Sequence, residues 1–181
     1  MNFLSALLNS LPGAAAQGLI WGLMAIGVYI TYRILDFPDL TVDSSFPLGA
    51  AVSATLTLQG VAPWLTLLIG CAAGGIAGLI TGLIHVKCRV RDLLSGIITM
   101  TGLYSINLHI AQNKANLPLF GGDTLFRNAF TKSLPKAIFP YTTLIIILLI
   151  ALIAKILLDL FLRTKCGYLL RAAGDNPSVV T

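Results

Sequence analysis

Four long apolar blocks constrain the fold of this 181-residue chain more than any other feature of its sequence. The few charged residues inside them lie close to their ends. An α-helix needs about 20 predominantly apolar residues to cross the hydrocarbon core of a bilayer. The sequence therefore predicts four membrane-spanning helices, over Ala14–Leu35, Pro63–His85, Leu93–Ala111 and Phe139–Leu158.

The composition excludes a soluble globular domain. Hydrophobic residues make up 56% of the chain and charged residues only 10%, whereas soluble domains carry about 25% charged residues. The net charge of +5 does not indicate nucleic-acid binding, because the basic residues lie in short loops beside apolar blocks. We expect an all-α, polytopic transmembrane bundle with no nucleic-acid partner.

A fifth apolar segment, Pro47–Gln59, is too short to cross the membrane comfortably as a straight helix. It is either a short tilted span or a re-entrant segment, and broken backbone at membrane depth is tolerated only when protein or water surrounds it. With this segment the bundle has about five membrane-embedded parts. No long polar linker divides the chain, so we expect a single transmembrane domain over residues 1–181.

Two short basic loops set the expected orientation. Basic residues next to membrane spans concentrate on the cytoplasmic side. The loops Val86–Asp92 and Arg163–Arg171 are therefore expected in the cytoplasm, and the longer connection Gln112–Ile138 outside. We expect a multi-pass protein of the bacterial cytoplasmic (inner) membrane. The basic residues of the two loops are Lys87, Arg89, Arg91, Arg163, Lys165 and Arg171.

The block Leu93–Ala111 is unusually polar for a membrane span. Polar side chains at membrane depth point into the bundle or toward a water-filled path. This face is our candidate lining of a transport route, with interhelical hydrogen bonding as the alternative. A hydrolytic pair of Ser95 and His109 is excluded on one straight helix, since about 21 Å separates them at 1.5 Å per residue. The candidate lining residues are Ser95, Thr99, Ser105 and His109.

Small residues mark one face of the block Pro63–His85. A row of glycines lets a neighbouring helix approach closely. We expect a packing groove there, either static or sliding during transport. Its residues are Gly70, Gly74, Gly78 and Gly82.

The sequence offers no metal or cofactor site. Its three cysteines, Cys71, Cys88 and Cys166, lack metal-ligand spacing, and an odd number with two of them in basic loops argues against a disulfide framework. No Gly-x-x-x-x-Gly-Lys-Ser/Thr run is present to bind a nucleotide. We expect no cofactor and no catalytic residues.

The stretch Asp36–Val52 is the most distinctive in the chain. It holds three aspartates within eight residues, and Asp43 with Ser44 and Ser45 is expected to cap the helix that follows. The run Phe-Pro-Asp-Leu-Thr-Val-Asp, followed by Ser-Phe-Pro-Leu-Gly-Ala-Ala-Val, resembles the signature of ABC importer permeases related to the branched-chain amino acid and ribose permeases. It is most similar to those of suspected tryptophan and tyrosine transport systems. The signature residues are Asp36, Pro38, Asp39, Thr41 and Asp43.

A second motif, Thr164–Pro177, resembles the cytoplasmic coupling loop of the same family. By this resemblance it docks on the ATPase subunit. The residues alone are equally consistent with an amphipathic helix that anchors the bundle at the interface. The coupling residues implied are Gly167, Arg171, Ala172, Gly174 and Asn176.

The resemblance implies a permease subunit of an ATP-driven importer for amino acids or similar small solutes. Its implied partners are a separate ATPase, an extracytoplasmic binding protein, a second permease copy and membrane lipid. Members of the family continue with further helices beyond this motif, so the chain corresponds to the N-terminal part of their fold. The alternatives are a gradient-driven transporter or channel, and a truncated membrane scaffold that transports nothing.

Overall fold

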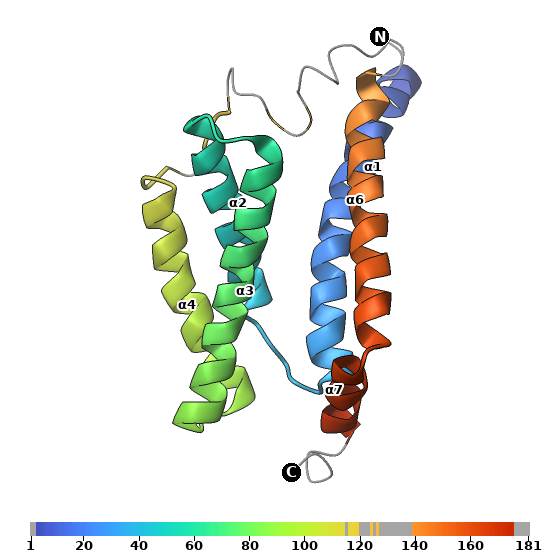
Figure 1. Ribbon diagram of the computed structural model, residues 1–181. Coiled ribbons are helices and arrows are strands. Elements are labelled where there is room, and N and C mark those ends of the chain that lie inside the picture. Colours follow the sequence, from blue (N-terminus) through green and yellow to red (C-terminus); the bar gives the residue numbers. More distant parts are fainter. Residues whose placement is uncertain (1–2, 115, 120–123, 125, 127–138, 176–181) are drawn as a thin grey trace. The chain divides into compact units, whose positions relative to one another are not determined.

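The computed structural model describes residues 3–114, 116–119, 124, 126 and 139–175 (Figure 1). The predicted all-α membrane architecture is confirmed, because all the secondary-structure elements assigned in these ranges are helices. In chain order the helices are α1 (Phe3–Tyr29), the π-helix η1 (Ile30–Ile34), α2 (Val42–Leu58), α3 (Pro63–Cys88), α4 (Asp92–Ile110), α6 (Phe139–Leu162) and α7 (Lys165–Asp175).

The four predicted spans are confirmed, with shifted ends. The helical stretches long and apolar enough to cross a membrane are Ser10–Ile34, Pro63–Cys88, Asp92–Ile110 and Tyr141–Leu162. α3 continues to Cys88 and stops where Arg89 takes a left-handed backbone conformation (φ +54°). α6 runs past Asp159 because one charged residue near a helix end does not interrupt its backbone hydrogen bonds.

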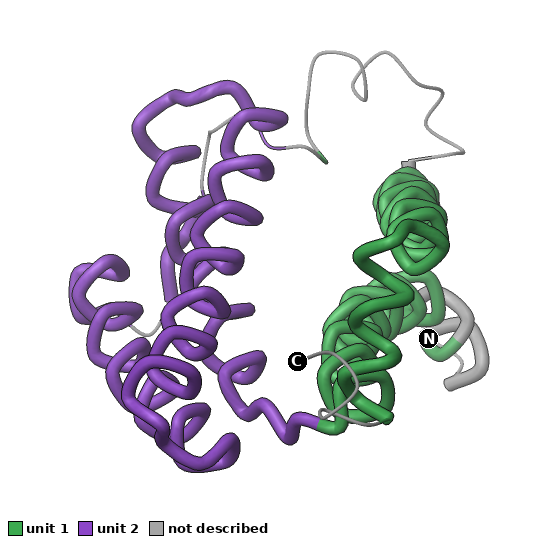
Figure 2. The backbone as a smooth tube through the Cα atoms, turned by 60° about the horizontal axis from the view of Figure 1, so that its bottom comes forward, with its two compact units in different colours: residues 1–36, 126–181 green, residues 37–125 purple. Residues whose placement is uncertain are grey.

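The chain divides into two compact units, shown in Figure 2. Unit 1 contains residues 1–36 and 126–181, and unit 2 contains residues 37–125. In unit 1, α1 and α6 lie side by side, with Ala16 and Ile147 buried. α7 follows α6 and contacts η1. A single domain over residues 1–181 stays a prediction.

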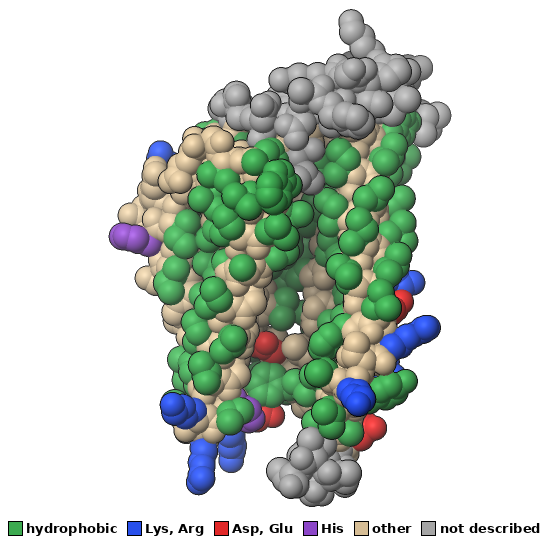
Figure 3. All heavy atoms as spheres, viewed as in Figure 1, with side chains coloured by type: hydrophobic (Ala, Val, Ile, Leu, Met, Phe, Trp, Pro, Cys, Tyr) green, Lys and Arg blue, Asp and Glu red, His purple; other side chains and the backbone are tan. Residues whose placement is uncertain are grey.

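Unit 2 is a three-helix unit in which α2 packs against both α3 and α4. Its buried core consists of Leu48, Ala77 and Leu103, one residue from each helix. Large apolar side chains such as Leu79 (63% exposed) face outward, as the lipid-facing side of a membrane protein requires. Figure 3 shows hydrophobic side chains along the lengths of the helices in each unit.

The short apolar segment forms one continuous helix rather than a re-entrant hairpin. α2 begins at Val42, so Pro47 lies inside the helix and does not start it. At 1.5 Å per residue its 17 residues cover about 26 Å, less than the hydrocarbon thickness of about 30 Å. The preceding residues 36–39 have no regular secondary structure. α2 therefore needs this segment to complete a crossing.

Candidate functional site

The predicted coupling loop is a helix, α7, which follows directly after α6. Thr164 precedes its first residue, and the Gly167 amide donates to the Thr164 hydroxyl oxygen (3.4 Å). Serine and threonine at this position satisfy an otherwise free amide of the first helical turn. The short Thr164 turn therefore lets the chain leave α6 and start a new helix at once.

The two faces of α7 differ in chemistry. Gly167, Leu170 and Gly174 follow the i, i+3, i+7 spacing of one helix face and are buried or half-buried. Lys165 and Arg171 are exposed, as is Tyr168, whose exposed fraction is 62%. α7 therefore packs its small residues against the rest of unit 1 and leaves a basic and aromatic surface exposed.

Glycine is required at both ends of the seated face. A Cβ atom at Gly167 would lie 2.5 Å from the Leu162 Cα, and one at Gly174 would collide with the Ile34 carbonyl oxygen. Real Cβ atoms do not come this close to backbone, so any side chain would push α7 away from α6 or η1. The two predicted glycines thus fix the position of α7 through close backbone contact.

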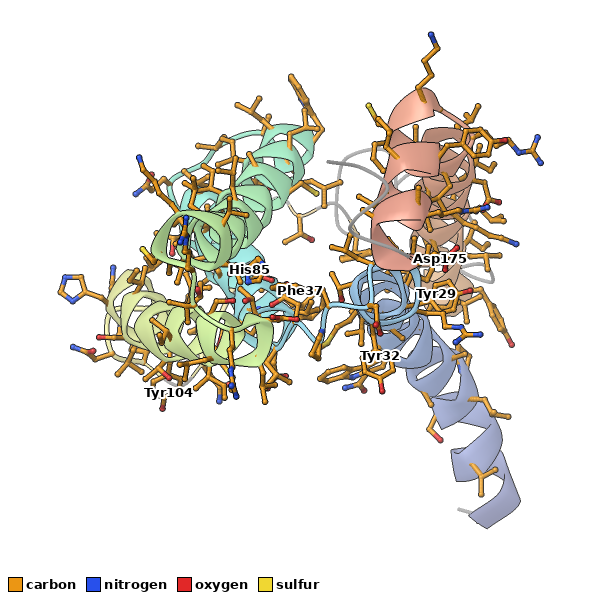
Figure 4. The ribbon with its side chains drawn as sticks, turned by 90° about the horizontal axis from the view of Figure 1, so that it is seen from below. Tyr29, Tyr32, Phe37, His85, Tyr104 and Asp175 are labelled. Atoms are coloured by element: carbon orange, nitrogen blue, oxygen red, sulfur yellow. The ribbon has the colours of Figure 1, made fainter. Side chains whose placement is uncertain are left out.

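A pocket of about 360 Å³ lies at the junction of η1 and α7. One basic and two acidic residues, Arg33, Asp36 and Asp175, are among the residues that line it. Figure 4 shows Tyr32 and Asp175 at this end of unit 1. Ala172 is half-buried and does not line the pocket, and Asn176 lies outside the described residues. The lining residues are Tyr32, Arg33, Ile34, Asp36, Gly174 and Asp175.

The signature turn leads into α2, without the predicted caps. We expected Asp43, Ser44 and Ser45 to cap this helix, but Asp43 lies in the first helical turn, and Thr41 at the N-cap position makes no side-chain capping hydrogen bond. The Thr41 amide donates to Asp39 Oδ1 over 2.8 Å. An aspartate side chain readily accepts a hydrogen bond from the backbone two residues on, so Asp39 stabilises the turn that leads into α2.

The rest of the turn lies along α3 and α4. The hydroxyls of Thr41 and Thr81 share a buried hydrogen bond of 2.8 Å. The Phe37 ring meets the His85 ring edge-on, with centroids 5.1 Å apart (Figure 4). A Cβ at Gly96 would lie 3.1 Å from the Leu40 amide nitrogen, so glycine permits this close approach.

Two further signature residues begin the turn without joining these contacts. Asp36 has a positive φ of 51°, which turns the chain sharply out of η1. Pro38 follows in the extended segment and is half-buried. The backbone here is therefore shaped by conformation rather than by side-chain hydrogen bonds.

The polar residues of α4 do not share one environment. Ser95 and Thr99 are buried, and their hydroxyls donate to the Asp92 and Ser95 carbonyls of their own helix (2.7 and 3.0 Å). Ser105 and His109 are exposed. The predicted single face is therefore divided, because the buried stripe continues through Leu103. A transport route lined by these residues stays a prediction.

Hydrogen bonds between helices come from residues that the sequence reasoning did not assign as sites. The Ser44 hydroxyl donates to the Met100 carbonyl (3.1 Å), and the Asn107 side-chain amide donates to the Ser44 carbonyl (3.0 Å). Asn107 lies in the polar block Leu93–Ala111, and its partner on α2 is 63 residues away. No local pattern indicates such a pairing.

The glycine row also splits. Gly70 lies against Gly49 at the crossing of α2 and α3, and Gly74 lies near the Ser45 carbonyl oxygen. Gly78 and Gly82 have nothing within 4 Å of an added Cβ among the described residues. Steps of four residues advance 40° around a helix with 3.6 residues per turn, so the row rotates out of the contact. Within unit 2 the close contact therefore ends at Gly74, and a continuous packing groove stays a prediction.

No metal-binding cluster of histidine, cysteine or acidic residues occurs in the described part of the chain. Its three cysteines are exposed free thiols. The absence of a cofactor stays a prediction.

Several proteins of known name are similar to this chain. It is 40% identical over 173 residues to a tyrosine transport system permease protein of Clostridioides difficile (strain R20291), covering 96% of this chain and 55% of that protein. It is 30% identical over 180 residues to a probable branched-chain amino acid transport permease protein LivH of Methanocaldococcus jannaschii, covering 93% and 55%. An uncharacterised protein of Rickettsia prowazekii (strain Madrid E) is 36% identical over 173 residues, covering 96% and 58%.

The chain spans a little more than half the length of these relatives. No solved structure matches it. The permease relatives and the apolar helices confirm the prediction of a multi-pass protein of the bacterial inner membrane. The family described as "Branched-chain amino acid transport system / permease component" matches residues 10–181. The chain belongs to this family of transport permeases.

Proposed function

We propose that the chain acts as a permease subunit of an ATP-driven importer of amino acids. The observation that carries this proposal is the packing of α7, in which Gly167 lies against α6 and Gly174 against η1 while Tyr168 and Arg171 stay exposed. The family match over residues 10–181 supports the transport class. The name of the tyrosine transport permease supports an amino-acid substrate.

In this proposal α7 is the element that an ATPase subunit binds. Arginine and tyrosine are over-represented among the residues that dominate protein interfaces, and both are exposed on α7. A displacement of α7 would pass to η1 and α1, because Gly174 brings the α7 backbone against the Ile34 carbonyl. Packed backbone shifts as a unit rather than yielding gradually.

The proposed partners are a separate ATPase, an external substrate-binding protein, a second permease copy and the surrounding lipid. The chain itself would carry out no covalent chemistry. The rival functions are a gradient-driven carrier or channel, which would work without an ATPase, and a scaffold, which would not transport. The exposed polar residues Ser105 and His109 of α4 are proposed to face the transport route, since polar side chains at membrane depth avoid lipid.

The test is co-purification with a candidate ATPase, followed by measurement of its stimulated ATP hydrolysis. We expect Arg171→Glu to weaken binding by about tenfold or more, since reversing an interface charge costs about 1.4 kcal/mol or more. Lys87→Glu, an equal charge reversal at an exposed position of unit 2, is the control and should change little.

Retention of binding and stimulation by Arg171→Glu would refute the coupling role of α7. Uptake that persists when the ATPase is absent would favour the gradient-driven rival. Loss of uptake in both variants would point to a general defect of insertion.

A further inference from the structure

The signature turn enters unit 2 alongside α3, well inside the end of that helix. Phe37 lies beside His85, three residues before the last residue of α3, Cys88. Thr41 is hydrogen-bonded to Thr81, seven residues before that end. At 1.5 Å per residue the start of α2 therefore lies about 10 Å from the end of α3.

α4 gives the same depth independently. The Ser44 hydroxyl bonds to the Met100 carbonyl, eight residues after the first residue of α4, or about 12 Å along its axis. Position along α4 corresponds to depth in the membrane, because its 19 residues cover about 29 Å and the hydrocarbon core is about 30 Å thick. The first turn of α2 therefore lies about 10 Å inside the boundary on the side of the basic Val86–Asp92 loop.

This position puts carboxylates below the membrane surface. Asp39 is half-buried and accepts the Thr41 amide hydrogen bond. Asp43 is exposed; its backbone amide donates to the Leu40 carbonyl (3.3 Å), and its carboxylate forms no ion pair or hydrogen bond with the described residues. A charged aspartate facing hydrocarbon costs about 3 kcal/mol on insertion scales. Non-helical backbone at this depth is tolerated only where protein or water surrounds it.

The exposed residues of α2 continue along one face. Asp43, Pro47 and Ala50 follow the i, i+4, i+7 spacing and are all exposed, whereas Ser44 and Leu48 on the opposite side are buried against α3 and α4. Phe46, also exposed, lies on the same face. The carboxylate therefore stands at the inner end of a face that the rest of unit 2 leaves open.

We infer that Asp43 faces a water-filled opening continuous with the cytoplasm, and that this face of α2 lines the transport route. The inference rests on the transport function proposed above. The inference also gives the non-helical segment before α2 a role. Because α2 starts inside the membrane boundary, its first turn would otherwise bring the ionised Asp43 side chain into lipid without compensation.

Cysteine accessibility tests the inference. In a background with Cys71→Ser, Cys88→Ser and Cys166→Ser, single cysteines are introduced by Asp43→Cys or Ala50→Cys. Inside-out vesicles containing the full chain are treated with a charged, membrane-impermeant methanethiosulfonate. Leu79→Cys is the control at the depth of Asp43, since Leu79 is 63% exposed on the side of α3 away from α2. Lys87→Cys reports full cytoplasmic access.

We expect Asp43→Cys to react within about tenfold of the Lys87→Cys rate and Leu79→Cys to react about 100-fold slower, because only the hydrated thiolate is reactive. Ala50→Cys keeps Asp43 in place and should also react faster than Leu79→Cys. Labelling in detergent-solubilised, denatured samples confirms that each thiol is present. Rates at positions 43 and 50 as slow as at position 79 would overturn the inference.

The labelling rate does not depend on an ATPase, so it separates this inference from the transport proposal. If Asp43→Cys is labelled while ATP-driven uptake is absent from the unmodified chain, the opening exists and the transport proposal fails. If uptake is present and the face is unlabelled, the inference alone fails. An acidic residue at this depth would also serve a proton-coupled carrier. Asp43→Asn should therefore leave uptake dependent on the ATPase.

Discussion

The crossing of α2 and α3 predicts a steep sensitivity to a single methyl group at Gly70. A Cβ at this position would lie 2.9 Å from the Gly49 carbonyl oxygen and 3.6 Å from the Ser53 Cβ. The opposing atom at 2.9 Å is backbone, which cannot rotate aside as a flexible side chain can. Gly70→Ala must therefore push the two helices apart by a few tenths of an ångström.

The magnitude follows from two opposed effects. Overpacking a close contact costs about 1–3 kcal/mol, while replacing glycine by alanine inside a helix gains about 1 kcal/mol in helix propensity. The control Gly78→Ala lies on the same helix with nothing within 4 Å of the added methyl group. The propensity gain is common to both variants, so their difference isolates the steric cost, about 1–3 kcal/mol.

The assay is reversible unfolding of the purified protein in mixed micelles with increasing denaturing detergent. We expect Gly70→Ala to unfold at a lower detergent fraction than Gly78→Ala, and Gly70→Val to unfold lower still. Equal unfolding midpoints for the two alanine variants would refute the close approach of α2 and α3. A lower midpoint for Gly78→Ala alone would show that the tight contact is at Gly78 and not at Gly70.

Three further predictions concern single contacts. Thr41→Val and Thr81→Val should each lower the free energy of unfolding, and a double-mutant cycle should give a coupling of about 0.6 kcal/mol for their shared hydrogen bond. Asn107→Leu should destabilise unit 2 by less than about 1 kcal/mol. The substitution loses the hydrogen bond to the Ser44 carbonyl, but it also removes an amide oxygen that is buried without a partner among the described residues. A larger loss in the same unfolding assay would contradict this reasoning. Gly174→Ala should leave membrane insertion intact but increase protease access to α7, since its methyl group collides with the Ile34 carbonyl oxygen; unchanged proteolysis would exclude the seated position of α7.

The membrane class and the positions of the spans could be predicted because both depend on local sequence. A run of about 20 apolar residues is sufficient for a span, and α1, α3, α4 and α6 all contain one. The resemblance of the Asp36–Val52 stretch likewise predicted the family that the comparisons establish. The glycines at positions 167 and 174 were predicted by motif, and the structure adds the backbone atoms that they meet.

The assignment of helix faces was less successful, because spacing in sequence does not identify the neighbour. Gly70 and Gly78 look equivalent in a row of glycines, yet only Gly70 meets another backbone. Ser95 and His109 look like one polar face, yet one is buried and the other exposed. A helix can bury any of its sides, and the choice depends on where the other helices lie.

The sequence by itself determined that this protein lies in a membrane, where its spans are and which ends carry positive charge. Hydrophobic length and loop charge act on each segment separately, so they need no knowledge of the fold. Only the tertiary structure decided that α2 starts beside Thr81 and Met100. The physical reason is that depth along a neighbouring helix is set by contacts between residues 40 and 56 positions apart, which no local pattern records.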